Sequence, residues 1–181
     1  MWFGPTQAVP KGVMKSNLVY LRPLRVAYVR SVGPYSQSSE DAWSRLFEWL
    51  NQNGLSTIPG CGYGLMLDSP SVTPEAECRY DACIEMSTLP ENRAEGSLQV
   101  RKLPGGAYLR ERHIGCYSRM RDSALKAREN WAHSSGLSLD DKRPIAQIFL
   151  DDPRRSDAKE LRSDVCVPVI AGFTASDGST K

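Results

Sequence analysis

Two aspartates are the side chains in this sequence best suited to recognising a charged ligand. Asp81 in CRYDACIEM and Asp164 in LRSDVCVPV each lie in a short run that is rich in apolar residues. A carboxylate taken out of water costs free energy unless it is paired, and a lipophilic cation held by aromatic rings would pair it. Solvation, or ion pairs with nearby arginines, would also satisfy the acids and would contribute about 0 to 1 kcal/mol at the surface. The residues alone leave both interpretations open.

Alternation along the strands predicts which side chains accompany the two acids. In LRSDVCVPV the three valines point to one face, which we expect to be the core, and the acid points to the other face. The leucines and isoleucines of the neighbouring segments GYGLMLD and PIAQIFLDD are also expected in the core, so the side chains between them should share the cleft with the acids. The candidate ligand-binding residues are therefore Asp164, Asp81, Met66, Phe149, Gln147, Tyr108 and Cys166.

An internal repeat explains why the two acids occur in similar surroundings. At an offset of 82, nine residues between 24 and 56 coincide with residues of the second half. At an offset of 83, seven more coincide between 64 and 86, and Asp81 then matches Asp164. Such self-similarity is the signature of a duplicated unit. Each half of about 70 residues buries too little apolar area to be stable alone, so we expect the two halves to share a core.

The elements of the first half follow from its residue pattern. LRPLRVAYVRSVG predicts a strand, and SSEDAWSRLFEWLNQNGL predicts a helix that Ser38 or Ser39 caps and that Gly54 ends. Two more strands follow in GYGLMLD and CRYDACIEM. The second half repeats this plan, and the matched Trp49 and Trp131 are expected to anchor the core.

We therefore predict an α+β fold of two tandem strand-helix-strand-strand repeats with pseudo-twofold symmetry around a central ligand cleft. The cleft should lie where the sheet faces turned away from the helices meet. A single domain is expected over 19–170, with repeat one at about 19–88 and repeat two at about 98–170. Residues 1–18 are expected to be extended or disordered, and 171–181 a flexible tail.

Composition narrows the class of protein. Among 181 residues, 23 Lys and Arg against 21 Asp and Glu give a net charge of +2, which argues against direct binding to nucleic acid. No apolar run approaches the roughly 18 to 20 residues that cross a bilayer, and no signal peptide is recognisable, so we expect a cytoplasmic protein without membrane contact. The five cysteines are scattered, which predicts reduced thiols, and we expect neither a metal site nor a cofactor.

The segments VAYVRSVGPY, YGLMLDSPSVTPEAECRYDACIEM, LPGGAYLRERHIG and IFLDDP followed by ELRSDVCVPV resemble the GyrI-like domain. That family includes the DNA gyrase inhibitor protein and the effector-binding domains of AraC-type and MerR-type regulators. The resemblance covers about residues 19 to 170 and implies a two-repeat fold around a cleft that receives bulky cationic or aromatic compounds. It also implies that the acid on the last strand, Asp164, contacts the ligand. Many relatives carry an aromatic residue where this chain has Cys166, which implies a wider or less aromatic cleft.

Three functions are consistent with this resemblance. We favour a stand-alone small-molecule-binding protein, monomer or homodimer, that receives aromatic or lipophilic cations with Asp164 as its electrostatic anchor and gives protection against toxins. The alternative is a hydrolase of cyclopropane-containing genotoxic compounds that uses the same cleft, with Asp164 and Tyr108 as candidate catalytic residues. A third role is contact with DNA gyrase and its modulation. A stand-alone form is expected because residues 1–18 are too few for a helix-turn-helix domain.

Overall fold

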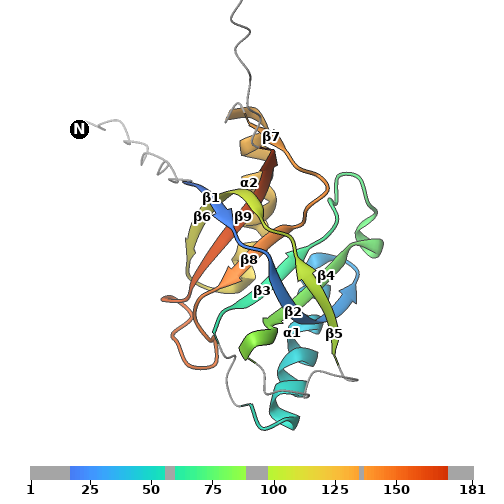
Figure 1. The fold of residues 1–181 in the computed structure, drawn as a ribbon, viewed down its shortest axis with the longest axis vertical. Coiled ribbons are helices and arrows are strands. Elements are labelled where there is room, and N and C mark those ends of the chain that lie inside the picture. Colours follow the sequence, from blue (N-terminus) through green and yellow to red (C-terminus); the bar gives the residue numbers. More distant parts are fainter. Residues whose placement is uncertain (1–16, 56–59, 89–97, 135–136, 171–181) are drawn as a thin grey trace, which may run out of the picture.

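A curled antiparallel sheet, shaped as a half-barrel, carries two helices in the computed structural model of the chain (Figure 1). The structure describes residues 17–55, 60–88, 98–134 and 137–170. The helices are α1 (Tyr35–Gln52) and α2 (Met120–Ser134). The strands are β1 (Asn17–Leu21), β2 (Leu24–Val32), β3 (Gly62–Met66), β4 (Arg79–Glu85), β5 (Gln99–Leu103), β6 (Gly106–Ile114), β7 (Ser138–Leu139), β8 (Ile145–Phe149) and β9 (Arg162–Ile170). Short 3-10 turns lie at Glu75–Glu77, Met86–Thr88 and Tyr117–Arg119.

The strand order places the boundary between the two halves at the centre of the sheet. Eight strands follow the order β1-β6-β9-β8-β3-β4-β2-β5, and β7 pairs with β9. The central pair, β3 and β8, is antiparallel, with Gly64 opposite Gln147 and Met66 opposite Ile145. The predicted α+β class is thus confirmed, and residues of both halves lie side by side at the middle of the sheet.

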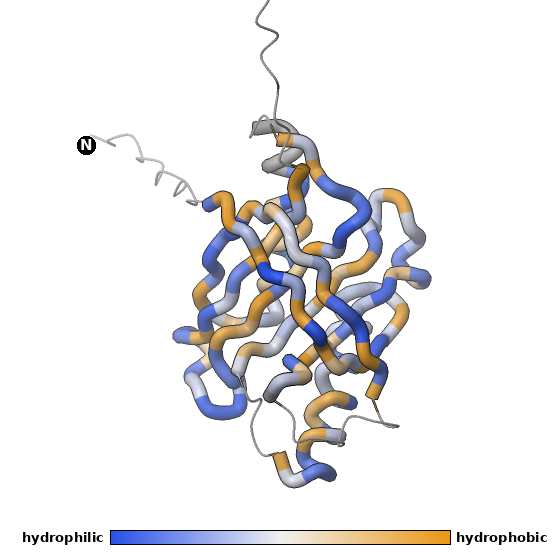
Figure 2. Tube along the Cα trace, viewed as in Figure 1, coloured by the Kyte–Doolittle hydropathy of each residue, from blue (hydrophilic) through white to orange (hydrophobic). Residues whose placement is uncertain are grey.

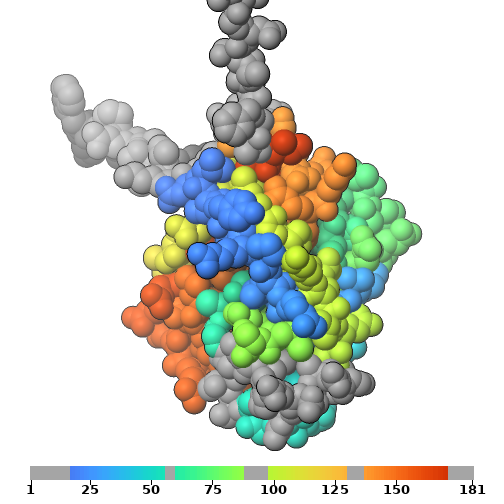
Figure 3. Space-filling view, in the orientation of Figure 1, coloured from blue at the N-terminus to red at the C-terminus, as the bar shows by residue number. Residues whose placement is uncertain are grey.

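Two strands that the sequence pattern did not predict, β1 and β5, close the face of the sheet that is turned away from the helices. The chain passes from β1 into β2, but β1 pairs with β6, while β5 pairs with β2. The two bent segments therefore cross, and in Figure 3 they run over this face in blue and yellow-green. At the crossing, a Cβ on Gly105 would lie 2.6 Å from Pro23 Cδ and 2.8 Å from the Leu21 carbonyl oxygen. Only glycine fits there.

Apolar side chains form a core on each side of the sheet. Hydrophobic residues lie along the strands in Figure 2, where the tube is orange. On the helix side, α1 contributes Leu46 and Leu50, and α2 contributes Met120 and Ala124. They pack on strand residues that include Ala82, Ile84, Val165 and Val167. The second core, inside the curl, contains Val26, Leu65, Cys83, Tyr108 and Cys166. The cleft predicted on this second side is therefore wrong, because a core fills it.

Helix α1 begins earlier than its sequence pattern indicates. Its first residue is Tyr35, after Pro34, and no side chain caps it. The hydroxyl of Ser38 instead donates to the Gly33 carbonyl oxygen at 3.1 Å, and that of Ser39 donates to the Tyr35 carbonyl oxygen at 2.6 Å. The predicted cap is therefore wrong. Pro34 stands at the position before the helix with its φ fixed by the ring, and its carbonyl oxygen accepts from the Gln37 and Ser38 N–H groups at 2.8 and 2.9 Å.

The C-terminal end of α1 agrees with the prediction. Gly54 adopts a φ of +73°, the left-handed conformation that glycine takes readily, and the Leu55 N–H donates to the Leu50 carbonyl oxygen at 2.8 Å. Trp49 is buried, as predicted, whereas the side chain of Trp131 lies outside the described part of the structure. The predictions for residues 1–16 and 171–181 also lie outside it. No described helix is both long and apolar enough to cross a membrane.

Candidate ligand-binding site

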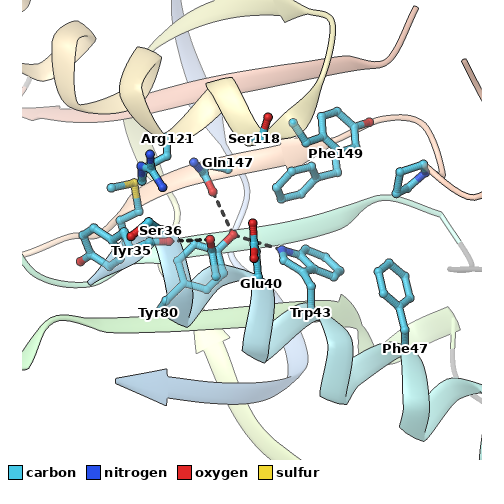
Figure 4. A pocket seen from close by; sticks show the side chains of 14 residues that line it. Tyr35, Ser36, Glu40, Trp43, Phe47, Tyr80, Ser118, Arg121, Gln147 and Phe149 are labelled. Carbon is cyan, nitrogen blue, oxygen red and sulfur yellow. Dashed lines mark hydrogen bonds between the residues drawn. The ribbon is translucent and has the colours of Figure 1, made fainter. Parts of the chain in front are cut away.

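An apolar pocket of about 240 Å³ opens between α1 and the start of α2, on the helix side of the β3–β8 pair (Figure 4). Helix α1 supplies one wall, and Tyr117, Ser118 and Arg121 supply part of the opposite wall. Strand residues from both halves, Met66 and Gln147 among them, form the floor. The pocket thus lies between segments from the two halves of the chain.

Aromatic rings line most of this pocket. Trp43 packs edge-on against Phe149 with ring centroids 5.0 Å apart, and Tyr117 packs edge-on against the same ring at 4.7 Å. Phe47 lies against Trp43 at 5.5 Å. The faces of such rings carry negative charge density, which attracts cations as well as other rings. The walls therefore suit a flat aromatic or lipophilic cationic molecule.

A short hydrogen-bond relay forms the polar part of the floor. The Trp43 indole Nε1–H donates to the Tyr80 hydroxyl oxygen at 3.1 Å, and that hydroxyl donates to Gln147 Oε1 at 2.9 Å (Figure 4). Tyr80 is fully buried, and burial raises the pKa of its phenol above the ordinary value. The phenol consequently stays protonated at physiological pH and keeps its donor role.

A carboxylate lies at the mouth of the pocket. Glu40, on the second turn of α1, is exposed to solvent and extends toward the space between the helices (Figure 4). It forms no hydrogen bond or ion pair within the described part of the chain, whereas Arg121 across the mouth pairs with Asp122 through Nε and Oδ1 at 3.1 Å. Glu40 is therefore available to a positive ligand.

The sequence interpretation missed Glu40 as a site residue because it was assigned to the first turn of a helix starting near Ser38. With the helix starting at Tyr35, residues at helical spacing form a second face beside the core face. These residues are Ser36, Glu40, Trp43 and Phe47. Two polar side chains followed by two large aromatic ones at helical spacing on this face are the signal that could have identified the pocket.

Three of the residues predicted for the site line the pocket: Met66, Gln147 and Phe149. They reach it on the opposite side of the sheet from the two acids, so the prediction that acids and pocket residues share a face is wrong. Cross-strand partners point to the same side of a sheet. Because Gln147 pairs with Val165 and Met66 pairs with Tyr80, these side chains share the helix side with the core valines. The error lay in the alternation assigned to β3 and β8.

The predicted acid Asp81 is enclosed by arginines on the other side of the sheet. Its side chain is fully buried, and its oxygens accept from Arg30 Nε at 2.7 Å, Arg30 Nη2 at 2.9 Å and Arg101 Nη1 at 2.5 Å. The two guanidinium groups also lie over the Tyr28 ring, at 5.3 and 5.8 Å. The hydrogen bonds that Arg30 donates to Asp81 raise the pKa of Arg30. This is the ion-paired arrangement that the sequence left open.

Asp164 has a similar but looser arrangement. It accepts from Arg112 Nε at 2.5 Å and from Arg112 Nη2 at 3.3 Å, with Arg110 Nη1 at 4.0 Å. The hydrogen bond to Asp164 raises the pKa of Arg112. Neither acid lines the pocket between the helices.

Tyr108 and Cys166, the last two predicted site residues, lie in the second core. The Tyr108 hydroxyl donates to the Pro104 carbonyl oxygen at 3.3 Å, and the Arg143 guanidinium lies 4.7 Å from its ring centre. Burial raises the pKa of the Cys166 thiol to about 12. Both side chains therefore serve packing in this structure. Within residues 17–170, leaving out the undescribed gaps, no group of three His, Cys, Asp or Glu residues is arranged to hold a metal ion.

Comparison with curated proteins finds relatives of part of this chain. The SPbeta prophage-derived protein YosT of Bacillus subtilis (strain 168) is 35% identical over 99 residues, which cover 52% of this chain and 62% of YosT. DNA gyrase inhibitor 2 of Dickeya dadantii (strain 3937) is 32% identical over 90 residues, which cover 48% of this chain and 54% of that protein. The chain thus spans somewhat more than half the length of these relatives.

Solved structures show the same fold. The C-terminal domain of EcmrR superposes with a TM-score of 0.64 at 17% identity, covering 87% of this chain and 98% of that domain. SAV2435, solved bound to tetraphenylphosphonium, superposes with a TM-score of 0.58 at 11% identity, covering 87% of this chain and 95% of that protein. The model of the GyrI-like small molecule binding domain matches residues 14–170. This chain is therefore a member of the GyrI-like small molecule binding domain family.

Proposed function

We propose that the protein binds lipophilic organic cations with aromatic surface in the pocket between α1 and α2. The observation that carries the proposal is the unpaired carboxylate of Glu40 at the mouth of a pocket walled by aromatic rings. A cation that enters such a pocket loses hydration, and it regains free energy from the ring faces and from the negative charge. Bulky compounds of this type contact several rings at once.

The comparisons support the class of ligand without identifying it. The family model describes small-molecule binding, and SAV2435 is a protein of this fold that holds a lipophilic cation. At 11% identity the likeness extends to the fold alone, so the chemistry rests on this chain's own residues. The proposal moves the electrostatic anchor from Asp164, which arginines neutralise, to Glu40.

Duplication of an ancestral half is part of this proposal, because it explains why the pocket lies between matched elements. The Tyr35 hydroxyl donates to the Asp68 carbonyl oxygen at 2.7 Å, and the matched Tyr117 hydroxyl donates to the Asp151 carbonyl oxygen at 2.8 Å. The matched ion pairs of Asp68 with Arg79 and of Asp151 with Arg162 measure 2.7 and 2.8 Å. These similar contacts support two related halves. The strand order, in which β8, β9 and β6 follow outward from the centre as β3, β4 and β2 do, supports a pseudo-twofold axis between them.

Calorimetric titration with tetraphenylphosphonium tests the proposed function. We expect saturable binding to the wild type and about fivefold weaker binding to Glu40→Gln, since a charge contact at the mouth of the pocket contributes about 1 kcal/mol. Glu48→Gln is the matched control, because Glu48 is exposed on the same helix outside the pocket, where it accepts from Gln52 Nε2 at 3.2 Å. It should bind as the wild type does. Undetectable wild-type binding, or equal affinity of Glu40→Gln and wild type, contradicts the proposal.

Two further assays test the hydrolase alternative and the contact with gyrase. Incubation with a cyclopropane-bearing alkylating compound would favour hydrolysis if product accumulated beyond one equivalent of protein. Copurification with purified gyrase, or inhibition of its supercoiling, would favour the partner role, which the name of the Dickeya relative suggests for that protein.

A further inference from the structure

The Gln147 side-chain amide presents its unpaired NH2 group to the bottom of the pocket. The residue is 3% exposed, and its Oε1 accepts from the Tyr80 hydroxyl at 2.9 Å. Its Nε2 has no hydrogen-bond partner within the described part of the chain. Among the described residues, the side-chain polar atoms that are both fully buried and without a hydrogen-bond partner are Trp49 Nε1 and Ser163 Oγ. Gln147 Nε2 is not one of them, so it is not fully buried. It therefore keeps contact with the pocket, where a ligand atom can accept from it.

The orientation of the Gln147 amide, that is, which of its ends faces Tyr80, follows from the Trp43 indole, which can only donate a hydrogen bond. Trp43 Nε1–H can only donate, so the Tyr80 oxygen must accept from it, at 3.1 Å. The single proton of the phenol is then free for Gln147, and no other acceptor for it occurs among the described residues. The amide oxygen must face Tyr80, and the nitrogen must face away from it, as Figure 4 shows.

A glycine on the adjacent strand makes room for this relay. Gly64 lies opposite Ala82 on β4 and opposite Gln147 on β8. A Cβ at Gly64 would overlap the Tyr80 hydroxyl and would lie 2.8 Å from Gln147 Oε1. The side chains from β4 and β8 meet above the bare backbone of β3, which fixes the position of the amide.

We propose that the pocket selects lipophilic cations that carry a neutral hydrogen-bond acceptor, such as a carbonyl or ether oxygen, on the part of the molecule that reaches β8. Gln147 Nε2 donates to this acceptor, while Glu40 at the mouth faces the positive charge. A wholly apolar end would leave a buried donor unpaired, which disfavours such ligands. The inference rests on the proposed function and adds a specificity-determining residue to it.

Two matched cations test this selectivity. The 1-phenacylpyridinium and 1-(2-phenylethyl)pyridinium ions differ only by a carbonyl in place of a methylene group. Calorimetric titration should show that the wild type binds the phenacyl ion about 3- to 10-fold more tightly, the range that one hydrogen bond supplies. Gln147→Met, which keeps the length of the side chain, should remove this preference, so that the two ions bind with similar affinity. Tyr80→Phe should reduce the preference, because the freed amide can turn its oxygen toward the ligand.

The outcomes separate this inference from the proposed function. If Glu40→Gln weakens both ions and the wild type binds them equally, the selectivity is wrong and the cation site stands. If neither ion binds, or Glu40→Gln binds both as the wild type does, the proposed function fails. Far-UV circular dichroism reports whether Gln147→Met has folded. Should that variant not fold, an undiminished preference in Tyr80→Phe overturns the inference.

Discussion

The two halves of the chain share a frame of contacts but differ where the pocket forms. In each half a tyrosine at the start of the helical segment holds the loop after the next strand, and an arginine–aspartate pair closes that loop. By contrast, Tyr80 on β4 matches Ser163 on β9, and Trp43 on α1 matches Leu125 on α2. The first half supplies a ring and a phenol where the second supplies smaller side chains.

This contrast separates residues that maintain the fold from residues that recognise a ligand. Matched identical residues, such as Asp81 and Asp164, pair with the matched arginines Arg30 and Arg112. The pocket depends on positions at which the halves differ, among them Glu40, Tyr80 and Gln147. Identical pairs such as Ser36 and Ser118 also line the pocket, so the difference between its two walls comes from the divergent positions.

The largest difference expected between the halves concerns the two buried aspartates. Asp81→Asn should lower the free energy of unfolding by about 3 kcal/mol, since it leaves two arginines without a counter-charge. Asp164→Asn should cost about 1 kcal/mol, because the Arg112 and Arg110 side chains are 46% and 39% exposed, against 31% and 25% for Arg30 and Arg101, so water compensates more of the loss. Urea unfolding of both variants measures the difference.

Titration of the same variants with tetraphenylphosphonium is the control for a role in binding. Asp164→Asn should change the affinity less than twofold, because Asp164 lies across the sheet from the pocket. A larger loss of affinity in Asp164→Asn than in Glu40→Gln would restore Asp164 as the anchor. Equal loss of stability in the two aspartate variants would remove the distinction between the halves.

At the matched positions Tyr80 and Ser163 we expect smaller changes in the free energy of unfolding, and the two changes should have opposite signs. Tyr80→Phe removes a phenol that bonds to both Trp43 and Gln147, and should cost about 1 to 2 kcal/mol of unfolding free energy. Ser163→Ala removes a buried hydroxyl that has no partner, and should be neutral or stabilising by about 1 kcal/mol. Thermal and urea unfolding measure both variants. Destabilisation by Ser163→Ala would indicate that its hydroxyl is bonded after all, for example to a buried water.

Much of the fold could be predicted from the sequence because local patterns determine it. The helical spacing around Leu46 and Leu50, the stop at Gly54 and the alternating valines near Asp164 each act within one element. The family resemblance adds the class, which the family model confirms. Strands β1 and β5 were missed because exposed residues such as Leu18, Tyr20 and Val100 hide their alternation.

The site was harder to predict, because it depends on which strand pairs with which. Met66, Gln147 and Phe149 were recognised as candidates, but their side of the sheet depends on the register of β3 with β4 and of β8 with β9. Leucine and isoleucine at alternate positions suggested one core, whereas both sides of this sheet are packed. Glu40 depends on where α1 begins, a boundary that Pro34 sets and that the serines after it obscure.

The smallest expected effect is on stability at acid pH, and it should be similar in both halves because it arises from the matched Asp68 and Asp151. The hydrogen bond from Arg79 lowers the pKa of Asp68, and that from Arg162 lowers the pKa of Asp151, both below the ordinary value near 3.8. A carboxyl whose pKa is depressed by folding stabilises the native state above its unfolded pKa, and this contribution is lost as the pH falls through the folded pKa. Stability should therefore fall below about pH 4.

Asp68→Asn and Asp151→Asn should each reduce the steepness of that fall, because asparagine binds no proton in this range. Amide and carboxylate share a carbonyl oxygen that can still accept from the Arg79 or Arg162 backbone N–H, which the aspartates bind at 2.8 Å. Urea unfolding at pH values between about 2.5 and 6 measures the slopes. Similar changes in the two variants would show that the two matched aspartate–arginine pairs contribute equally to stability as well as having the same geometry. A change in one variant alone would show that the matched loops contribute unequally, in spite of their matched contacts.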